Sequence, residues 1–134
     1  KPQMLMNNSG KALAKLFNYL KIRPKKFRPD LWVINDDLDI PLGKIKISQN
    51  RGAAGHKGVQ SIIDQLKTKN FIRFRIGIAV PIAQAKKIAA DKYVLKKIPG
   101  ADRTPFDQAI GTVISALSLA LSDGPEKSMT EFNQ

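Results

Sequence analysis

Two different spacings of apolar residues alternate along this chain, and they constrain its fold more than any other feature. In residues 44–48 and 71–79 apolar side chains occupy every second position, which is typical of strands with one exposed face. Elsewhere they recur every three or four positions, as on one side of a helix. These helical segments are residues 9–20, 59–66 and 105–121, with a weaker one at 83–95. Strands that alternate with helices predict an α/β fold with helices on both faces of a sheet.

Length and composition indicate how many domains to expect. With 134 residues, of which 43% are hydrophobic, the chain can form one core, so we expect a single domain over residues 1–134. The chain begins with Lys1 instead of methionine, and we expect it to be N-terminally incomplete. No apolar run approaches the ~20 residues of a membrane span, and there is no cysteine. These features predict a soluble protein, without membrane contact, in a reducing compartment such as the cytoplasm.

The chain is strongly basic. Lysine and arginine number 23 against 11 acidic residues, which gives a formal net charge of +12. Residues 11–28 carry seven basic side chains and no acidic one. This excess favours a polyanionic partner, and a basic surface that serves only solubility is the alternative. Because aromatic residues make up only 7% of the chain, we expect phosphate contacts to contribute more than base stacking.

Acidic residues follow the apolar run at residues 31–34. We interpret that run as a buried strand that ends before the acids. If alternate residues share a face, Asp36 projects where the strand ends, which is the usual position of ligand sites in α/β proteins. A cap or turn is the alternative role for an acid here. We assign that role to Asp37 and Asp39, because Asp39 precedes the turn at residues 40–43.

A glycine-rich loop at residues 52–58 leads into the second helix. Its backbone N–H groups, together with His56 and Lys57, are suited to an anion. The spacing matches no established phosphate motif, so a structural turn is an equal alternative. His56 is the only histidine, and its neighbours include neither a metal-ligand set nor a Ser-His-Asp set. On these grounds alone we expect His56 to be structural.

Six segments together carry a resemblance that none of them carries alone. They are KPQMLMNNSGKA at 1–12, VINDDLDIPLGK at 33–44, GHKG at 55–58, FIRFRIGI at 71–78, YVLK at 93–96 and GPEKSM at 124–129. In order and spacing they resemble the bacterial-type peptidyl-tRNA hydrolases over essentially the whole chain. The resemblance implies a monomeric α/β fold with a mixed sheet and no metal or cofactor. It also implies hydrolysis of the ester that links a peptide to the 3′ ribose of tRNA.

The resemblance further implies which residues act on the substrate, peptidyl-tRNA. In the family an aspartate orients a histidine that activates water, and Asp36 falls on that aspartate. Asn7 falls on an asparagine that binds the substrate. Leu5 and Met6 fall at the edge of the same pocket.

Four basic residues are expected at the substrate surface on the same grounds. Lys46 and Arg75 fall near the tRNA-facing side, in agreement with two strands whose polar faces are basic. His56 and Lys57 belong to the family's second glycine-rich loop, and we expect both to contact the substrate. Lys57 stands where the family usually has an asparagine, so a group that donates and accepts is replaced by one that only donates.

Another departure from the family concerns the catalytic base. The family's N-terminal segment, with the histidine that activates water, has no counterpart here, and His56 matches a different histidine. We therefore expect the chain as given to lack the general base. A non-catalytic RNA-binding relative, similar to the splicing factors of the family, is the alternative, and a basic ribosome-associated module is a third interpretation. The presence of both Asn7 and Asp36 favours the enzyme.

Overall fold

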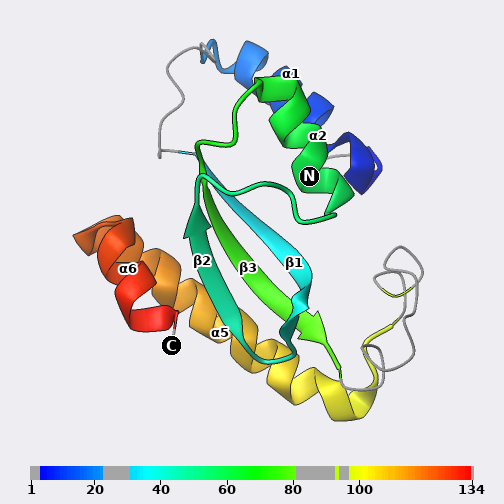
Figure 1. Cartoon of the computed structure of the whole chain (residues 1–134), viewed down its shortest axis with the longest axis vertical. Coiled ribbons are helices and arrows are strands. Elements are labelled where there is room, and N and C mark those ends of the chain that lie inside the picture. The colour runs from blue at the N-terminus through cyan, green and yellow to red at the C-terminus, as the bar shows by residue number, and fades with distance from the viewer. Residues whose placement is uncertain (1–3, 23–30, 81–92, 94–96, 134) are drawn as a thin grey trace. The chain divides into compact units, whose positions relative to one another are not determined.

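The computed structural model describes residues 4–22, 31–80, 93 and 97–133 (Figure 1). The chain forms two compact units, each assembled from two stretches of sequence. Unit 1 consists of Lys1–Val33 and Gln49–Ile72, and unit 2 consists of Ile34–Ser48 and Arg73–Gln134. None of the helices in the described ranges combines the length and hydrophobicity of a membrane span.

Helices dominate unit 1. The 3-10 helix η1 covers Met6–Asn8 and leads into α1, Ser9–Tyr19, while α2 covers Lys57–Leu66. Both α-helices lie where the apolar spacing predicts them. They enclose a core with a buried centre and a partly buried margin. Its centre is Ala53, Val59, Ile62 and Phe71, and its margin is Leu13, Leu31, Val33, Ile63 and Leu66.

α1 and α2 meet at Gly10. A β-carbon at Gly10 would collide with the carbonyl oxygen of Ser61, so the two backbones approach each other at a point where only glycine fits. The Gly10 N–H also donates to the Ser61 hydroxyl at 3.1 Å. This contact fixes the start of α1, and with it the preceding η1, against α2.

The sheet has three described strands in the order β1-β3-β2, namely β1 Trp32–Pro41, β2 Ile45–Gln49 and β3 Ile72–Ala79. The Asn50 N–H donates to the Phe71 carbonyl and the Gly77 N–H donates to the Lys44 carbonyl, so β2 and β3 run in opposite directions. β1 and β3 run in the same direction (Figure 1). The sheet is therefore mixed, as the family resemblance implies.

In unit 2 the sheet has one closely packed apolar face. Ile45, Ile47 and Phe74 are all buried there. Where β3 passes the end of β1, a β-carbon at Gly77 would collide with the carbonyl oxygen of Pro41. Gly77 is thus required by a close backbone approach within the sheet.

Helix α5, Gly100–Asp123, is longer than the helix that the apolar spacing predicted at residues 105–121. That spacing places apolar residues on one side of the helix, but Ile114 is 59% exposed and Leu121 is 77% exposed. The buried residues are Ala109, Val113, Ala116 and Ala120. Apolar residues occupy most sides of this helix, so their spacing could not select the inner face. Helix α5 runs along the sheet (Figure 1), and three of its four buried residues are alanines.

Helix α6, Pro125–Phe132, follows α5 and packs on it. The buried Ser128 hydroxyl donates to the carbonyl of Ala116 at 2.8 Å. Beyond α6, the side-chain amide of Asn133 accepts the N–H of Ile47 at 2.6 Å and donates to the Ile47 carbonyl at 2.9 Å. One side chain thereby satisfies both backbone groups of a residue in β2, as a neighbouring strand would.

The predicted helix at residues 83–95 lies outside the described residues, apart from Tyr93. The Tyr93 hydroxyl donates to the carbonyl of Ile78 at 2.8 Å. This bond ties Tyr93 to the end of β3 in unit 2.

Candidate functional site

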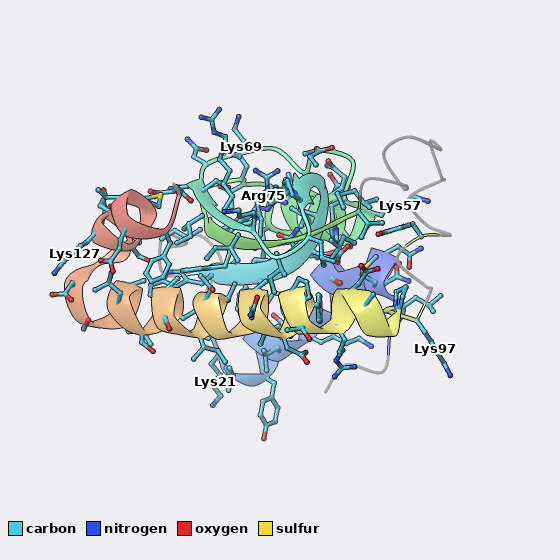
Figure 2. All side chains as sticks on the ribbon, turned by 90° about the horizontal axis from the view of Figure 1, so that it is seen from below. Lys21, Lys57, Lys69, Arg75, Lys97 and Lys127 are labelled. Carbon is cyan, nitrogen blue, oxygen red and sulfur yellow. The ribbon has the colours of Figure 1, made fainter. Side chains whose placement is uncertain are left out.

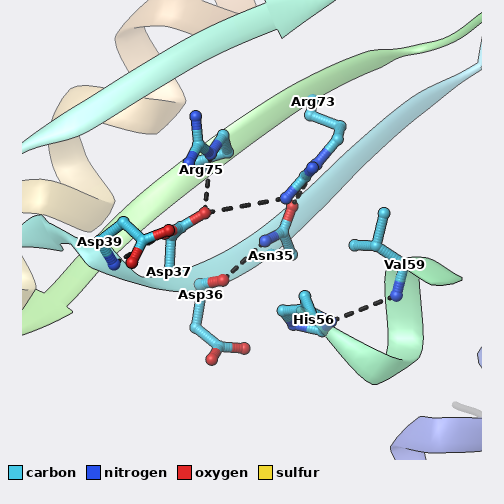
Figure 3. Close-up of polar contacts among 8 residues, drawn as sticks. All are labelled: Asn35, Asp36, Asp37, Asp39, His56, Val59, Arg73 and Arg75. Atoms are coloured by element: carbon cyan, nitrogen blue, oxygen red, sulfur yellow. Dashed lines mark hydrogen bonds and ion pairs between the residues drawn. The ribbon is translucent and has the colours of Figure 1, made fainter. Parts of the chain in front are cut away.

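The acidic segment lies inside a strand, not after one. β1 continues through Asp36 and ends at Pro41, so the prediction that the strand stops before the acids was wrong. The strand can continue because Asn35 and Asp37 find partners on β3 and are buried, at 9% and 7% exposure. Asp36 is partly exposed and points away from the side that Asn35 and Asp37 face (Figure 3).

Four side chains of β1 and β3, which we call the polar cluster, are Asn35, Asp37, Arg73 and Arg75 (Figure 3). The Arg73 Nε donates to Asn35 Oδ1 at 3.1 Å, and the Arg75 Nε donates to Asp37 Oδ2 at 2.7 Å. Arg73 Nη2 lies 3.8 Å from the same oxygen of Asp37. The polar cluster therefore joins β1 to β3 at the two positions that flank Asp36.

The polar cluster carries more positive than negative charge. The Asp37 carboxylate lies between the guanidinium groups of Arg73 and Arg75. Burial lowers the pKa of Arg73 below its usual value, the positive charge of Arg75 lowers it further, and Asp37 raises it. Removing the Asp37 carboxylate would leave buried positive charge without compensation, a change that typically costs about 3–5 kcal/mol.

Asp37 also shapes the backbone that follows it. Its Oδ1 accepts the N–H of Asp39 at 2.9 Å. The buried positions of β1 are Asn35 and Asp37 and then Ile40, so the alternation shifts by one residue after Asp37. We expected Asp37 to serve only as a cap or turn acid. It does bind the backbone, but it also pairs with two arginines.

Lys46 and Arg75, both predicted to contact RNA, lie opposite each other on β2 and β3. The Gly77 N–H donates to the Lys44 carbonyl at 2.8 Å, and the antiparallel register then places Lys46 beside Arg75. Figure 2 shows Arg75 on the side of the sheet away from α5. Lys46 is exposed and the Arg75 side chain is 16% exposed, whereas Arg73 is buried. The basic face of β3 is therefore less exposed than the alternation predicted.

In unit 1 the structure brings Met6 and His56 together near Gly58. Met6 Cγ lies 3.1 Å, and His56 Cε1 lies 3.0 Å, from the position that a β-carbon on Gly58 would take. Leu5 is 75% exposed, and Asn7 on η1 is also exposed. The predicted substrate residues of this unit thus gather around the start of α2.

His56 forms the cap of α2. Its Nδ1 accepts the N–H of Val59 at 3.2 Å, which is the structural role expected for a single histidine. Lys57, exposed at the first position of α2, adds positive charge to the positive end of the helix dipole. An anion bound there would relieve this repulsion. Nowhere in the described ranges do three His, Cys, Asp or Glu side chains gather as metal ligands would.

Sequence reasoning missed Asn35 and Arg73 as members of a site. A signal was present, because residues 35 and 37 of one strand and residues 73 and 75 of another are polar at the same spacing. Only the pairing of β1 with β3 brings them together, and β2 lies between these strands in sequence. Spacing alone does not reveal which strands become neighbours.

Comparisons with known proteins agree on one family. A family model described as peptidyl-tRNA hydrolase matches residues 1–134. A peptidyl-tRNA hydrolase of Thermodesulfovibrio yellowstonii is 40% identical over 100% of this chain and 68% of its own length, and one of Koribacter versatilis is 39% identical over 100% and 64%. The crystal structure of peptidyl-tRNA hydrolase from Acinetobacter baumannii matches with a TM-score of 0.79 and 27% identity, over 98% of this chain and 63% of that one. This chain thus spans about two thirds of the length of these relatives.

Proposed function

This chain belongs to the peptidyl-tRNA hydrolase family, and on that premise we propose that it hydrolyses the ester bond between peptide and tRNA. The products are free tRNA, which is available again for translation, and free peptide. The observation that carries the proposal is the family match over residues 1–134. From the resemblance to the family motifs, Asp36 and Asn7 are proposed as the acid and the asparagine of the site. The relatives named above are all called hydrolases, which argues against a purely RNA-binding role.

Asp36 is proposed to orient the histidine that activates water. A carboxylate can accept the N–H of an imidazole, fix its tautomer and stabilise the imidazolium that forms when water loses its proton. The position of Asp36 suits this role, because Asn35 and Asp37 on either side anchor β1 to β3. In addition, the Asn35 amide donates to the Asp36 carbonyl at 2.6 Å. The carboxylate therefore projects from a backbone that is held in place.

We propose that residues of unit 1 bind the peptide portion of the substrate. In unit 1, Asn7 would hold the peptide portion, with Leu5 and Met6 as apolar neighbours. Their exposure is consistent with contact to a ligand.

The RNA portion would be held by cations. Lys46 and Arg75 in unit 2 and Lys57 in unit 1 are proposed to contact phosphates, with His56 placing Lys57 through the cap of α2. Phosphate contacts of this kind supply affinity that depends steeply on salt.

The experiment that tests the function is hydrolysis of a peptidyl-tRNA at fixed salt and protein concentration. It compares this chain with a chimera in which the chain is joined to the residues of the Thermodesulfovibrio yellowstonii relative that lie outside the matched region. We expect the chimera to release free tRNA and peptide. Binding of tRNA by both proteins with hydrolysis by neither would contradict the proposal and favour an RNA-binding protein.

A further inference from the structure

We propose that Asp37 is a positioning residue that holds the guanidinium of Arg75 in the orientation that receives a phosphate group of the RNA. This inference rests on the proposed function, because it concerns how that function's RNA contact is built. Asp37 itself touches no substrate in this proposal. It acts through Arg75.

The Asp37 carboxylate is fixed at both oxygens. Oδ1 accepts the N–H of Asp39 at 2.9 Å, and Oδ2 accepts the Nε–H of Arg75 at 2.7 Å. The Asp37 side chain is only 6% exposed, so it has little room to rotate. An arginine bound through Nε to a fixed carboxylate is restricted in turn.

One edge of the Arg75 guanidinium remains for a ligand when the other edge binds Asp37. Arg75 binds Asp37 through Nε, whereas the two Nη groups form the other edge of the planar fork. The side chain is 16% exposed and lies on the side of the sheet away from α5 (Figure 2). An arginine oriented in this way presents two parallel N–H donors, which match two oxygens of a phosphate.

The polar cluster carries an excess of positive charge. Two guanidinium groups share the single carboxylate of Asp37, so one positive charge is in excess. Arg73 is 1% exposed, with its Nε bound to Asn35. Within this pair of arginines, therefore, an anion from solution can reach only Arg75.

The composition of the polar cluster also argues against a purely structural role. Burial lowers the pKa of Arg73, which means that its charged form is held at a cost. A buried ion pair is weak evidence for stability, and a second buried guanidinium beside it adds repulsion. Lys46, opposite Arg75, adds a further exposed cation on the same face. With Lys46 counted, three cations lie near the single carboxylate of Asp37, so the site is short of two negative charges.

The test measures tRNA affinity at several salt concentrations for this chain and for Asp37→Asn, Arg75→Gln and the double variant. If charge alone mattered, removing a carboxylate from a protein of charge +12 would strengthen tRNA binding. We expect the opposite, a loss of about 10-fold with a salt slope flatter by about one unit. In the Arg75→Gln background, Asp37→Asn should cause no further loss, because Asp37 acts through Arg75.

Asp107→Asn is the matched control, since it removes the carboxylate from an exposed arginine pair with Arg103 on α5. We expect this variant to bind tRNA as tightly as the original chain or slightly more tightly. If Asp37→Asn does not fold, Arg75→Lys is the deciding variant. Lysine keeps the positive charge of Arg75 but has no Nε–H that could bind Asp37. The same loss of about 10-fold is expected for it.

The outcomes separate this inference from the function on which it rests. Failure of the original chain to bind tRNA would overturn both. Binding by the original chain with equal or tighter binding by Asp37→Asn, or by Arg75→Lys where Asp37→Asn is unfolded, would overturn the positioning role alone. A further loss of tRNA affinity of about the same size when Asp37→Asn is added to Arg75→Gln would also overturn the positioning role, because Asp37 would then act independently of Arg75.

Discussion

Asp36 and Asp37 are neighbours in sequence with opposite surroundings. Asp37 is buried among arginines, whereas Asp36 is partly exposed on the other face of β1. A strand separates adjacent side chains in this way because its residues alternate between faces. The two carboxylates can therefore serve different purposes, one in the chemistry and one in building the strand that carries it.

Replacing Asp36 by Asn in the chimera described above is expected to lower hydrolysis of peptidyl-tRNA at least ~100-fold. The histidine that activates water would lose its charge partner and its correct tautomer. The variant should bind tRNA normally. Turnover in a single-round assay is the measurement, with Asp39→Asn as control, because Asp39 is exposed on the same strand. Undiminished turnover by Asp36→Asn would remove Asp36 from the catalytic site.

Lys57→Asn restores the residue that the family usually has at the start of α2. If Lys57 contacts a phosphate, this change should weaken tRNA binding and flatten its salt slope by about one unit. An unchanged slope would indicate that Lys57 faces the peptide or solvent.

Two glycines in helices give opposite expectations at the scale of elements. Gly10→Ala forces a β-carbon onto Ser61 where α1 and α2 meet, and such overpacking should destabilise the protein by about 1–3 kcal/mol or more. Gly111 in the middle of α5 has no atom within 4 Å of the same position. Gly111→Ala should therefore stabilise by about 1 kcal/mol. Urea unfolding of both variants measures the difference, and equal effects would contradict the close crossing.

The end of α5 carries a pH-dependent contribution. The pKa of Asp123 is lowered from its usual 3.8, first by a hydrogen bond from Ser122 and then by the charge of Lys127. The ionised form thus favours the folded state. This contribution is present above pH 3.8 and is lost as the pH falls through the lower folded value. Asp123→Asn should therefore reduce Tm slightly at neutral pH, and the difference should vanish in strong acid; a pH-independent difference would contradict it.

Elements whose apolar residues follow a single period were predictable from the sequence. α1, α2, β2 and β3 lie close to their expected positions for that reason. β1 was cut short because Asn35 and Asp37 resemble exposed polar residues until their arginine partners are known. The buried face of α5 could not be predicted from the apolar pattern. Large side chains such as Leu121 dominate that pattern, whereas the smaller alanines are the residues that are buried. The motif residues were named from family resemblance, whereas the polar cluster required the strand order.

At the scale of the whole molecule, charge is the property that both units share. A net charge of +12 predicts binding to RNA in general, so specificity has to come from particular contacts. With Lys46, Lys57 and Arg75 as phosphate contacts, the logarithm of tRNA affinity should fall with the logarithm of salt at a slope of about −2 to −3. A fluorescence titration across salt concentrations measures this slope. A value near zero would contradict an electrostatic origin of the affinity.

The Asn133 amide, which hydrogen-bonds to β2, can change chemically in stored protein. Asparagine deamidates slowly in solution, and the carboxylate that results accepts hydrogen bonds but donates none. The bond to the Ile47 carbonyl would then be lost, while the Ile47 N–H would keep an acceptor. Replacement of the amide nitrogen by oxygen would thus remove one of the two hydrogen bonds that Asn133 makes with this strand. Deamidation of Asn133 during storage would therefore change the hydrogen bonds of Ile47, a residue of β2 that is far from Asn133 in sequence.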